Sequence, residues 1–290
     1  MNQRSADCIL VLIVLIWGSS YLAMKWGMES FGIFTLIGLR FCIAFGIGLL
    51  LLWRRLSTIY LHTLVSSAIL GLCFFCGFTF LLTGMKTTTT TSAGFLMTTT
   101  VLFVPLLQVL LFRRIPNLIL ILAILLSISG VGLMTLQDGL AIDPGALLCL
   151  AGSLCYAVQI VTTKWVLRVE NAITIGLLQL GFTGLFALGA VFLFEMPFPA
   201  ATPASGVIII YLAIFCTLIG FVLQTVAQEY TSPEHTGLIY TLESVFAALF
   251  GYLFLREVLP LQGYIGMILV FAGVIIAVWS GNSSRGTTYA

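Results

Sequence analysis

Residues 172–194 read AITIGLLQLGFTGLFALGAVFLF, an apolar stretch without a single Asp, Glu, Lys or Arg. A stretch of about 20 apolar residues has the length of a helix that crosses the hydrocarbon core of a bilayer. Polar residues bound the stretch at both ends, with Asn171 before it and Glu195 after it. The segment therefore predicts a membrane-spanning helix.

The same pattern recurs along the whole chain. Charged and turn residues, such as Arg54-Arg55 and Asp143-Pro144-Gly145, stand between apolar stretches of about 20–25 residues, a length that suits helices rather than barrel strands. The apolar stretches cover residues 8–27, 32–53, 61–85, 91–112, 116–136, 145–166, 172–194, 206–228, 236–255 and 260–280. The pattern predicts an all-α integral membrane protein with ten transmembrane helices.

Composition points to the same class. Of the 290 residues, 60% are hydrophobic and 8% are charged, whereas a soluble domain carries about 25% charged residues. Ten helices leave only short loops, so we expect no additional soluble domain. The net charge of +2 argues against nucleic-acid binding, and the Cys73–Cys76 pair lies in an apolar stretch without a companion pair or a nearby histidine. We therefore expect no metal, no cofactor and no enzymatic activity.

The distribution of Lys and Arg predicts the orientation. With a cytoplasmic N-terminus and ten crossings, eight Lys or Arg residues fall on the cytoplasmic side and three on the outer side. The cytoplasmic set is Arg4, Arg54, Arg55, Arg113, Arg114, Lys164, Arg168 and Arg285, and the outer set is Lys25, Lys86 and Arg256. This bias predicts that both termini are cytoplasmic.

A faint internal repeat divides the chain into residues 1–140 and 141–290. At an offset of 139 residues, Lys25-Trp26 matches Lys164-Trp165, and Trp17 falls on Tyr156. At an offset of 143, matches include Cys73 with Cys216, Gly77-Phe78 with Gly220-Phe221, and Arg113 with Arg256. Because each half would hold five helices, an odd number, the two halves must have inverted topologies, as in many secondary transporters.

Several short motifs resemble a known family. They are Ile16-Trp17-Gly18-Ser19-Ser20-Tyr21, Arg40-Phe41, Val104-Pro105-Leu106-Leu107, Gly145-Ala146-Leu147-Leu148, and Leu242-Glu243-Ser244-Val245-Phe246-Ala247-Ala248-Leu249 followed by Leu255-Arg256-Glu257. In order and spacing these motifs are similar to those of EamA-type transporters of the drug/metabolite transporter superfamily. Two positions depart from the family's pattern: Arg113-Arg114 replaces a common acidic residue, and Ser244 replaces a common proline.

The resemblance implies a ten-helix carrier that moves small organic solutes without ATP. We therefore expect a secondary active transporter of a small polar or amphipathic metabolite that works by alternating access, either proton-coupled or as a uniporter or exchanger. The alternative is a non-transporting membrane sensor or assembly factor. We expect a bacterial plasma membrane protein, either a monomer or a homodimer, whose partners are a small-molecule substrate and the lipid bilayer.

Two ionisable residues lie deep in apolar stretches, where each costs about 2.5–3.5 kcal/mol to insert. Glu243 either locks its helix through hydrogen bonds or carries a proton or a cationic substrate group. Arg40 either forms a structural ion pair, for which Glu243 is one candidate, or holds a substrate carboxylate. Both are candidate substrate-binding residues.

The remaining candidates are aromatic or polar side chains within the same stretches. Tyr21 lies one helical turn after Trp17, and Tyr240 one turn before Glu243, so each pair shares a helix face. Aromatic faces bind ammonium groups and flat solutes, although such residues often serve only packing. The candidate substrate-binding set is Trp17, Tyr21, Arg40, Thr99, Tyr156, Gln159, Tyr240 and Glu243.

The lysines that end two of the apolar stretches, Lys25 and Lys164, occupy equivalent positions in the two halves. Lysines at helix ends usually extend toward lipid head groups. We expect that role for both, with a shared gating role as the alternative.

Overall fold

A computed structural model describes residues 3–56, 58–112, 118–135, 143–196, 202–231 and 233–283, and this part of the chain is almost entirely helical, without a strand. The helices are α1 (Gln3–Gly27), α2 (Ile33–Leu52), the 3-10 turn η1 (Trp53–Arg55), α3 (Leu61–Gly84), α4 (Thr90–Thr98), α5 (Thr100–Phe112), α6 (Leu118–Thr135), α7 (Pro144–Val166), α8 (Ala172–Phe194), α9 (Pro203–Tyr211), the π-helix η2 (Leu212–Ile219), α10 (Gly220–Tyr230), α11 (Pro233–Leu255) and α12 (Leu261–Ser283).

Seven segments of the described residues are long and apolar enough to cross a bilayer. They are Ser5–Gly27, Ile33–Leu52, Leu61–Gly84, Thr90–Leu107, Pro144–Val166, Ala172–Phe194 and Pro203–Tyr230. Shorter apolar segments lie in α11 and α12, at Leu242–Leu255 and Leu261–Gly273. The prediction of an all-helical membrane protein is confirmed, whereas the count of ten crossings stays a prediction.

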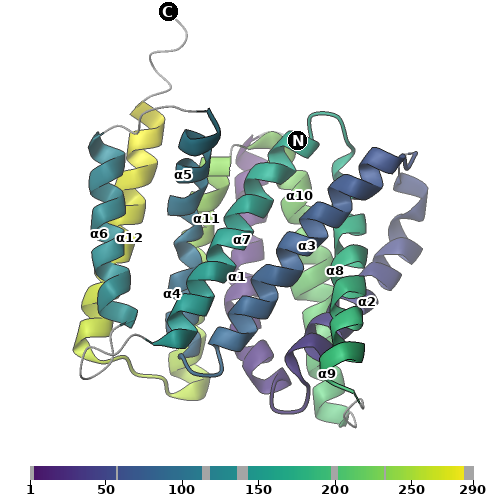
Figure 1. Cartoon of the computed structure of the whole chain (residues 1–290), viewed down its shortest axis with the longest axis horizontal. Coiled ribbons are helices and arrows are strands. Elements are labelled where there is room, and N and C mark those ends of the chain that lie inside the picture. Colours follow the sequence, from purple (N-terminus) through teal and green to yellow (C-terminus); the bar gives the residue numbers. More distant parts are fainter. Residues whose placement is uncertain are drawn as a thin grey trace, which may run out of the picture.

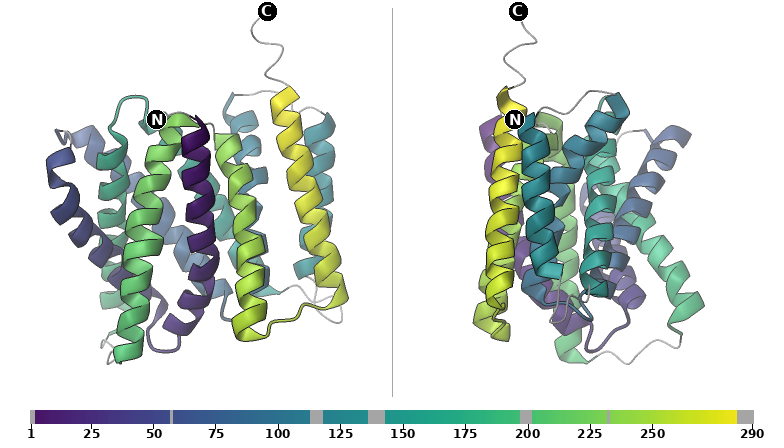
Figure 2. Two further views of the ribbon diagram at one scale, coloured as in Figure 1. Left: turned by 180° about the vertical axis from the view of Figure 1, so that it is seen from behind. Right: turned by 60° about the vertical axis from the view of Figure 1, so that its left-hand side comes forward.

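The helices run up and down in one bundle (Figures 1 and 2). Helices α6 and α12 pack against each other at one edge, and α2 lies at the opposite edge against α8. Helices α1, α3, α7 and α11 occupy the middle, where α3 packs on α7 and α1 packs on α11. The start of α1 and the end of α12 lie at the same end of the bundle, which we call the terminal end; the other we call the distal end.

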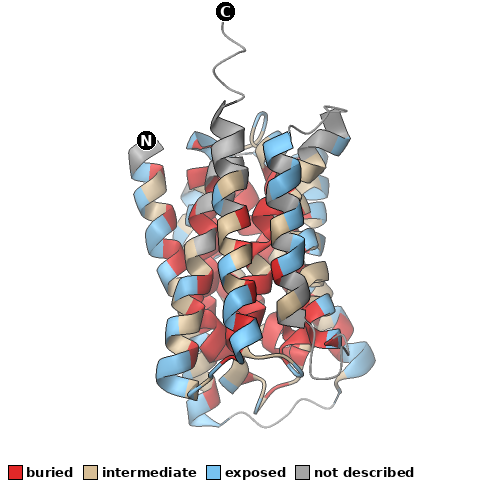
Figure 3. Ribbon diagram, turned by 90° about the vertical axis from the view of Figure 1, so that its left-hand side faces the viewer, coloured by how far each residue is buried: buried red, intermediate tan, exposed pale blue. Residues whose placement is uncertain are grey.

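The pattern of burial is that of a protein surrounded by lipid (Figure 3). Large apolar side chains point outward, and Leu50 and Leu193 are 77% and 76% exposed. Polar side chains point inward, so Gln179, Thr183 and Gln224 are fully buried. Water would favour the reverse arrangement, so lipid is the solvent that explains this surface.

Two predicted single stretches are interrupted in the structure. The stretch 91–112 breaks at Thr99, between α4 and α5, where three consecutive threonine hydroxyls bond back to carbonyls three residues earlier. Pro105 inside α5 further weakens regular helical bonding because it lacks a backbone N–H. The stretch 206–228 begins earlier, at Pro203, and contains the π-helix η2. Both interruptions lie beside the pocket described next.

Candidate functional site

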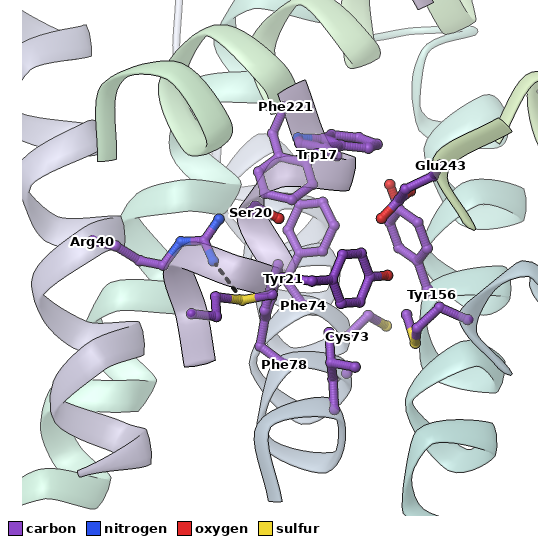
Figure 4. A pocket seen from close by; sticks show the side chains of 14 residues that line it. Trp17, Ser20, Tyr21, Arg40, Cys73, Phe74, Phe78, Tyr156, Phe221 and Glu243 are labelled. Atoms are coloured by element: carbon purple, nitrogen blue, oxygen red, sulfur yellow. Dashed lines mark hydrogen bonds between the residues drawn. The ribbon is translucent and has the colours of Figure 1, made fainter. Parts of the chain in front are cut away.

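A pocket lies at the centre of the bundle, among α1, α2, α3, α4, α7, α10 and α11 (Figure 4). It contains about 480 Å³ of space not filled by protein atoms. This figure includes space that is open to solvent. The lining consists of Trp17, Ser20, Tyr21, Met24, Arg40, Cys73, Phe74, Gly77, Phe78, Leu81, Met97, Tyr156, Phe221 and Glu243.

Arg40 enters the pocket from α2 and is only 1% exposed. Its Nε donates to Thr217 Oγ1 at 2.8 Å, and its Nη1 donates to Met24 Sδ at 3.2 Å. The guanidinium carbon lies 4.7 Å from the ring centroid of Phe78 and 5.3 Å from that of Phe41. Within the described residues no carboxylate lies at ion-pair distance from Arg40, so its charge has only neutral partners.

The π-helix η2 presents Thr217 to Arg40. The Thr217 hydroxyl donates to Leu212 O, five residues earlier, at 2.7 Å, and accepts the bond from Arg40. Single π turns occur frequently at functional sites because they displace side chains from regular helical positions. The π-helix η2 thus holds the Arg40 guanidinium in place through Thr217.

Glu243 enters from α11 on the side of the pocket opposite Arg40, with aromatic rings between them (Figure 4). The two residues form no ion pair, which settles one alternative left open by the sequence. The Tyr21 hydroxyl interacts with the Glu243 carboxyl group. A cationic group and a carboxyl group therefore face the same pocket without neutralising each other.

Trp17 lies at the centre of an aromatic wall, a group of packed rings that also includes Tyr156, Phe221 and Tyr240. Its indole Nε1 donates to Cys216 O at 2.9 Å, and its ring lies 4.9 Å from that of Phe221, 5.4 Å from Tyr240 and 6.4 Å from Tyr156, measured between centroids. Gly220 permits this approach, because a Cβ there would lie 2.5 Å from the indole nitrogen. Trp17 and Tyr156, which the sequence alignment of the two halves pairs, therefore lie together in the wall of the pocket.

A second, smaller pocket lies on the other side of Glu243. It is lined by Gly94, Met97, Thr98, Thr100, Tyr156, Tyr240 and Glu243. The Tyr156 and Tyr240 rings stack with centroids 5.9 Å apart and planes 8° apart. Glu243 and Tyr156 therefore border both pockets.

The structure brings six of the eight candidate residues to these two pockets. Thr99 and Gln159 are not among the residues that line them, and both are buried. Thr99 shares a hydrogen bond of 2.9 Å with Ser153, and the Gln159 amide donates to Thr163 and Gln179. These two residues join helices behind the pocket wall.

Several lining residues were not candidates from the sequence. Phe74 and Phe78 lie one turn apart on α3, and Phe221 packs 4.5 Å from Phe74 and 5.9 Å from Phe78 between centroids. For Phe78 and Phe221 the sequence did hold a signal, because the matched dipeptides Gly77-Phe78 and Gly220-Phe221 contribute three lining residues, whereas Phe74 has no such match. Residues matched between the two halves therefore indicated the pocket, in addition to the charged residues.

At the distal end, two carboxylates cap the N-termini of helices by accepting hydrogen bonds from backbone N–H groups. Glu195 accepts from the backbone N–H groups of Phe34 and Thr35 on α2, at 2.9 and 2.7 Å. Glu257 accepts from the N–H groups of Thr90 and Thr91 on α4, at 3.0 and 2.9 Å. Burial alone would raise the pKa of Glu257, but the bonds from Thr91 and Thr90 outweigh it, and the pKa is lowered.

The two equivalent lysines tie helices together rather than reaching only toward lipid. Lys25 Nζ lies 3.2 Å from Glu257 Oε1 at the distal end. Lys164 Nζ donates to three carbonyls where α10 ends, those of Gln228, Glu229 and Thr231, at 2.9, 3.1 and 3.0 Å. The two lysines that the sequence alignment of the halves pairs thus link helices at opposite ends of the bundle.

The described residues contain no group of three or more His, Cys, Asp or Glu side chains positioned to hold a metal ion. The pocket is lined by one guanidinium, one carboxyl group, hydroxyls, a thiol, thioethers, aliphatic side chains and aromatic rings.

Comparison with known proteins gives matches over nearly the whole chain. The model of the EamA-like transporter family matches residues 4–136 and 143–279. An uncharacterized transporter of Archaeoglobus fulgidus is 29% identical over 285 residues, covering 95% of this chain and 86% of its own. The uncharacterized transporter YetK of Bacillus subtilis is 26% identical over 304 residues, covering 96% of this chain and 88% of its own.

A solved crystal structure has the same fold. It aligns with a TM-score of 0.68 at 20% sequence identity and covers 99% of this chain and 100% of its own. The likeness therefore extends over the whole bundle.

Proposed function

The chain belongs to the EamA-like transporter family, and we propose that it is a secondary active carrier that moves a small organic solute by alternating access without ATP. The observation that carries the proposal is the central pocket, in which Arg40 and Glu243 face each other across aromatic rings without forming an ion pair. An assembly factor would have no need of such a pocket, whereas a sensor that binds a ligand would, so transport itself separates the carrier from the sensor.

The pocket favours an amphipathic solute with an anionic group. Arg40 is buried with only neutral partners, and a buried charge is strongly stabilised by an opposite charge. A carboxylate or similar anion on the solute would supply that charge. The rings of Phe74, Phe221 and Trp17 suit an apolar or aromatic body, and the available space limits it to a small compound.

We assign substrate contact to the six candidates that reach the pockets. Arg40 binds the anionic group, Trp17 and Tyr156 form the aromatic wall, and Glu243 binds a polar group or exchanges a proton during the cycle. Tyr21 and Tyr240 position Glu243 from α1 and from its own helix. Thr99 and Gln159 do not contact the substrate in this proposal; they act by joining the helices that form the pocket wall.

The architecture that we propose has ten crossings in two inverted halves, residues 1–140 and 141–290. The count follows if α4 and α5 form one crossing and α9, η2 and α10 form another. Helix contacts support this arrangement, because each contact has a counterpart with the roles of the two halves exchanged. The contact of α3 with α7 corresponds to that of α10 with α1. The contact of α1 with α11 corresponds to that of α7 with α4 and α5. The two stretches matched by the family model, 4–136 and 143–279, support the same division.

The proposed location is a bacterial plasma membrane, with the terminal end in the cytoplasm. Of the residues behind the Lys and Arg bias, Arg113, Arg114 and Arg285 lie outside the described residues. Arg54 and Arg168 lie at the terminal end, while Lys86 and Arg256 lie at the distal end, which supports the orientation.

A ligand screen on the purified protein tests the proposal. Small amphipathic anions should raise the thermal unfolding temperature of the wild-type protein, and Arg40→Gln should abolish that shift. Arg54→Gln is the matched control because it removes an exposed arginine that stacks on Trp53, away from the pocket. Equal shifts in all three proteins would place the binding site elsewhere and refute the assignment.

A further inference from the structure

A column of buried polar side chains extends from the second pocket toward the terminal end. Helix α10 contributes Gln224 and Gln228, which lie one turn apart on the same face. Helix α11 contributes Thr236 and Tyr240, also one turn apart. Thr231, between these helices, is 5% exposed, and the four other side chains are 0–4% exposed.

The column is continuous with the pocket at its distal side. The Tyr156 hydroxyl, which borders both pockets, donates to Gln224 Oε1 at 3.3 Å. Gln228 lies beside Tyr240, and Tyr240 lines the second pocket together with Glu243. At its other side the column reaches the last turn of α10, where Lys164 binds the carbonyls of Gln228 and Thr231.

Six polar atoms of this column have no partner at hydrogen-bond distance among the described residues, although the Tyr240 hydroxyl also interacts with Tyr156 and Gln228. They are Gln224 Nε2, Gln228 Nε2, Gln228 Oε1, Thr231 Oγ1, Thr236 Oγ1 and the Tyr240 hydroxyl. Buried polar atoms in native proteins pair with protein groups or with ordered water. A cluster of six such atoms, all on one route, therefore fits a chain of water molecules.

A neighbouring polar layer shows the contrast. The Gln159 amide donates to Gln179 at 3.2 Å, and the Gln179 amide donates to Thr225 at 3.0 Å. These side chains bond mainly to one another and join α7, α8 and α10. Cross-linking between helices accounts for that layer, in which Gln159 Oε1 lacks a partner, whereas six atoms of the column lack one.

We propose that the column is a hydrated passage through which protons move between Glu243 and water at the terminal end. This inference rests on the proposed function and adds a route for a coupling proton that is separate from the substrate's anion site at Arg40. A proton from water at the end of α10 passes by exchange along the hydrogen-bonded waters, and the Glu243 carboxylate accepts it. Release runs in reverse, and no bond of the solute forms or breaks.

The groups that face Glu243 are consistent with this role. Tyr21 approaches from α1, Tyr156 from α7 and Tyr240 from α11 itself, while Thr98 and Thr100 approach from the α4–α5 junction. Across the pocket stand Arg40 of α2 and Cys216 of η2, and Tyr264 of α12 is exposed at the distal end. Lys164 lies at the terminal end of the column. Its positive charge is offset by the backbone carbonyls of α10 that it binds.

Infrared spectroscopy can follow the Glu243 proton without a known substrate. In purified protein, the protonated carboxyl C=O band that disappears in Glu243→Gln belongs to Glu243. Replacing H₂O by D₂O shifts this band as the proton exchanges, and the rate of the shift is measured. Gln228→Leu removes two unpaired polar atoms from the column and should slow the exchange by at least roughly tenfold, because it interrupts the chain.

Thr183→Val is the matched control. It removes a buried hydroxyl of α8 that bonds to Gly71 O and Gln179 O, outside the column, and should leave the exchange rate unchanged. Thr236→Val, a change of similar shape, gives a second interruption if Gln228→Leu does not fold.

The outcomes separate the two proposals. A normal exchange rate in both column variants would overturn the passage while leaving proton exchange at Glu243 in place. If no band sensitive to Glu243→Gln appears between about pH 5 and 8, Glu243 does not take up a proton there, and both ideas fail. Slow exchange in the column variants and normal exchange in Thr183→Val is the result that the passage requires.

Discussion

Replacing Glu257 with alanine should destabilise the distal end of the bundle by a predictable amount. Its carboxylate accepts the N–H groups of Thr90 and Thr91, while the Thr89 hydroxyl accepts that of Ser92. The backbone N–H groups of Thr90, Thr91 and Ser92 in the first turn of α4 are thus all paired with side-chain acceptors. Arg256 adopts a left-handed conformation, with φ of 55°, and this turn directs Glu257 back toward α4.

The expected loss follows from these contacts. Loss of a capping group costs about 0.5–2 kcal/mol, and a negative charge at a helix start adds about 0.3–1 kcal/mol. The pair with Lys25, whose side chain is 36% exposed, adds about 0–1 kcal/mol after screening by solvent. Glu257→Ala should therefore lower the free energy of unfolding by about 1–4 kcal/mol, and Lys25→Met by about 1 kcal/mol or less.

The pH dependence has a definite sign. Because the folded-state pKa of Glu257 is lowered, its contribution is fully present above the unfolded pKa, about 4.3, and is lost as pH falls through the folded pKa. Unfolding in mixed detergent micelles at several pH values measures the difference between wild type and Glu257→Ala. That difference should shrink toward zero below about pH 4. A difference that is absent at neutral pH, or unchanged in acid, would refute this reasoning.

Three further predictions concern the pocket and the topology. Glu243→Gln should fold normally, but its transport should fall steeply and lose its pH dependence between about pH 5 and 8; a wild-type pH profile would remove Glu243 from the mechanism. Trp17→Phe leaves Cys216 O without its donor, so unfolding measurements should show a loss of about 1–3 kcal/mol, whereas an unchanged stability would contradict the role of that bond. Reporter fusions at position 290 and in the 136–144 loop, of which the structure describes only residues 143–144, should report opposite sides of the membrane, and the same side would exclude ten crossings.

Periodic composition was enough to predict the helices. Stretches such as 172–194 match α8 at both ends because the apolar segment, its polar boundaries and the helix coincide. The break at Thr99 and the π-helix at Leu212–Ile219 were not predicted, since both depend on side chains that bond to the backbone locally or across helices. Apolar patterning contains no information about such bonds.

The candidate site was only partly accessible from the sequence. Arg40 and Glu243 were recognisable because charges in apolar stretches are rare, and Trp17 because its repeat partner is also aromatic. Phe74 and Met97 were not, because an apolar residue that lines a pocket has the same pattern as one that packs in a core. Whether Arg40 meets Glu243 depended on the packing of α2 against α8 and η2, which only the three-dimensional arrangement provides.

Counterflow in proteoliposomes tests the central claim most directly. A labelled compound found in the ligand screen should accumulate in vesicles preloaded with the same unlabelled compound, without ATP, when they contain wild-type protein or Arg54→Gln. Arg40→Gln and Glu243→Gln should each abolish this accumulation, because the proposed site places the solute between those two residues. Wild-type counterflow in both pocket variants, or none with the wild-type protein, would contradict the account.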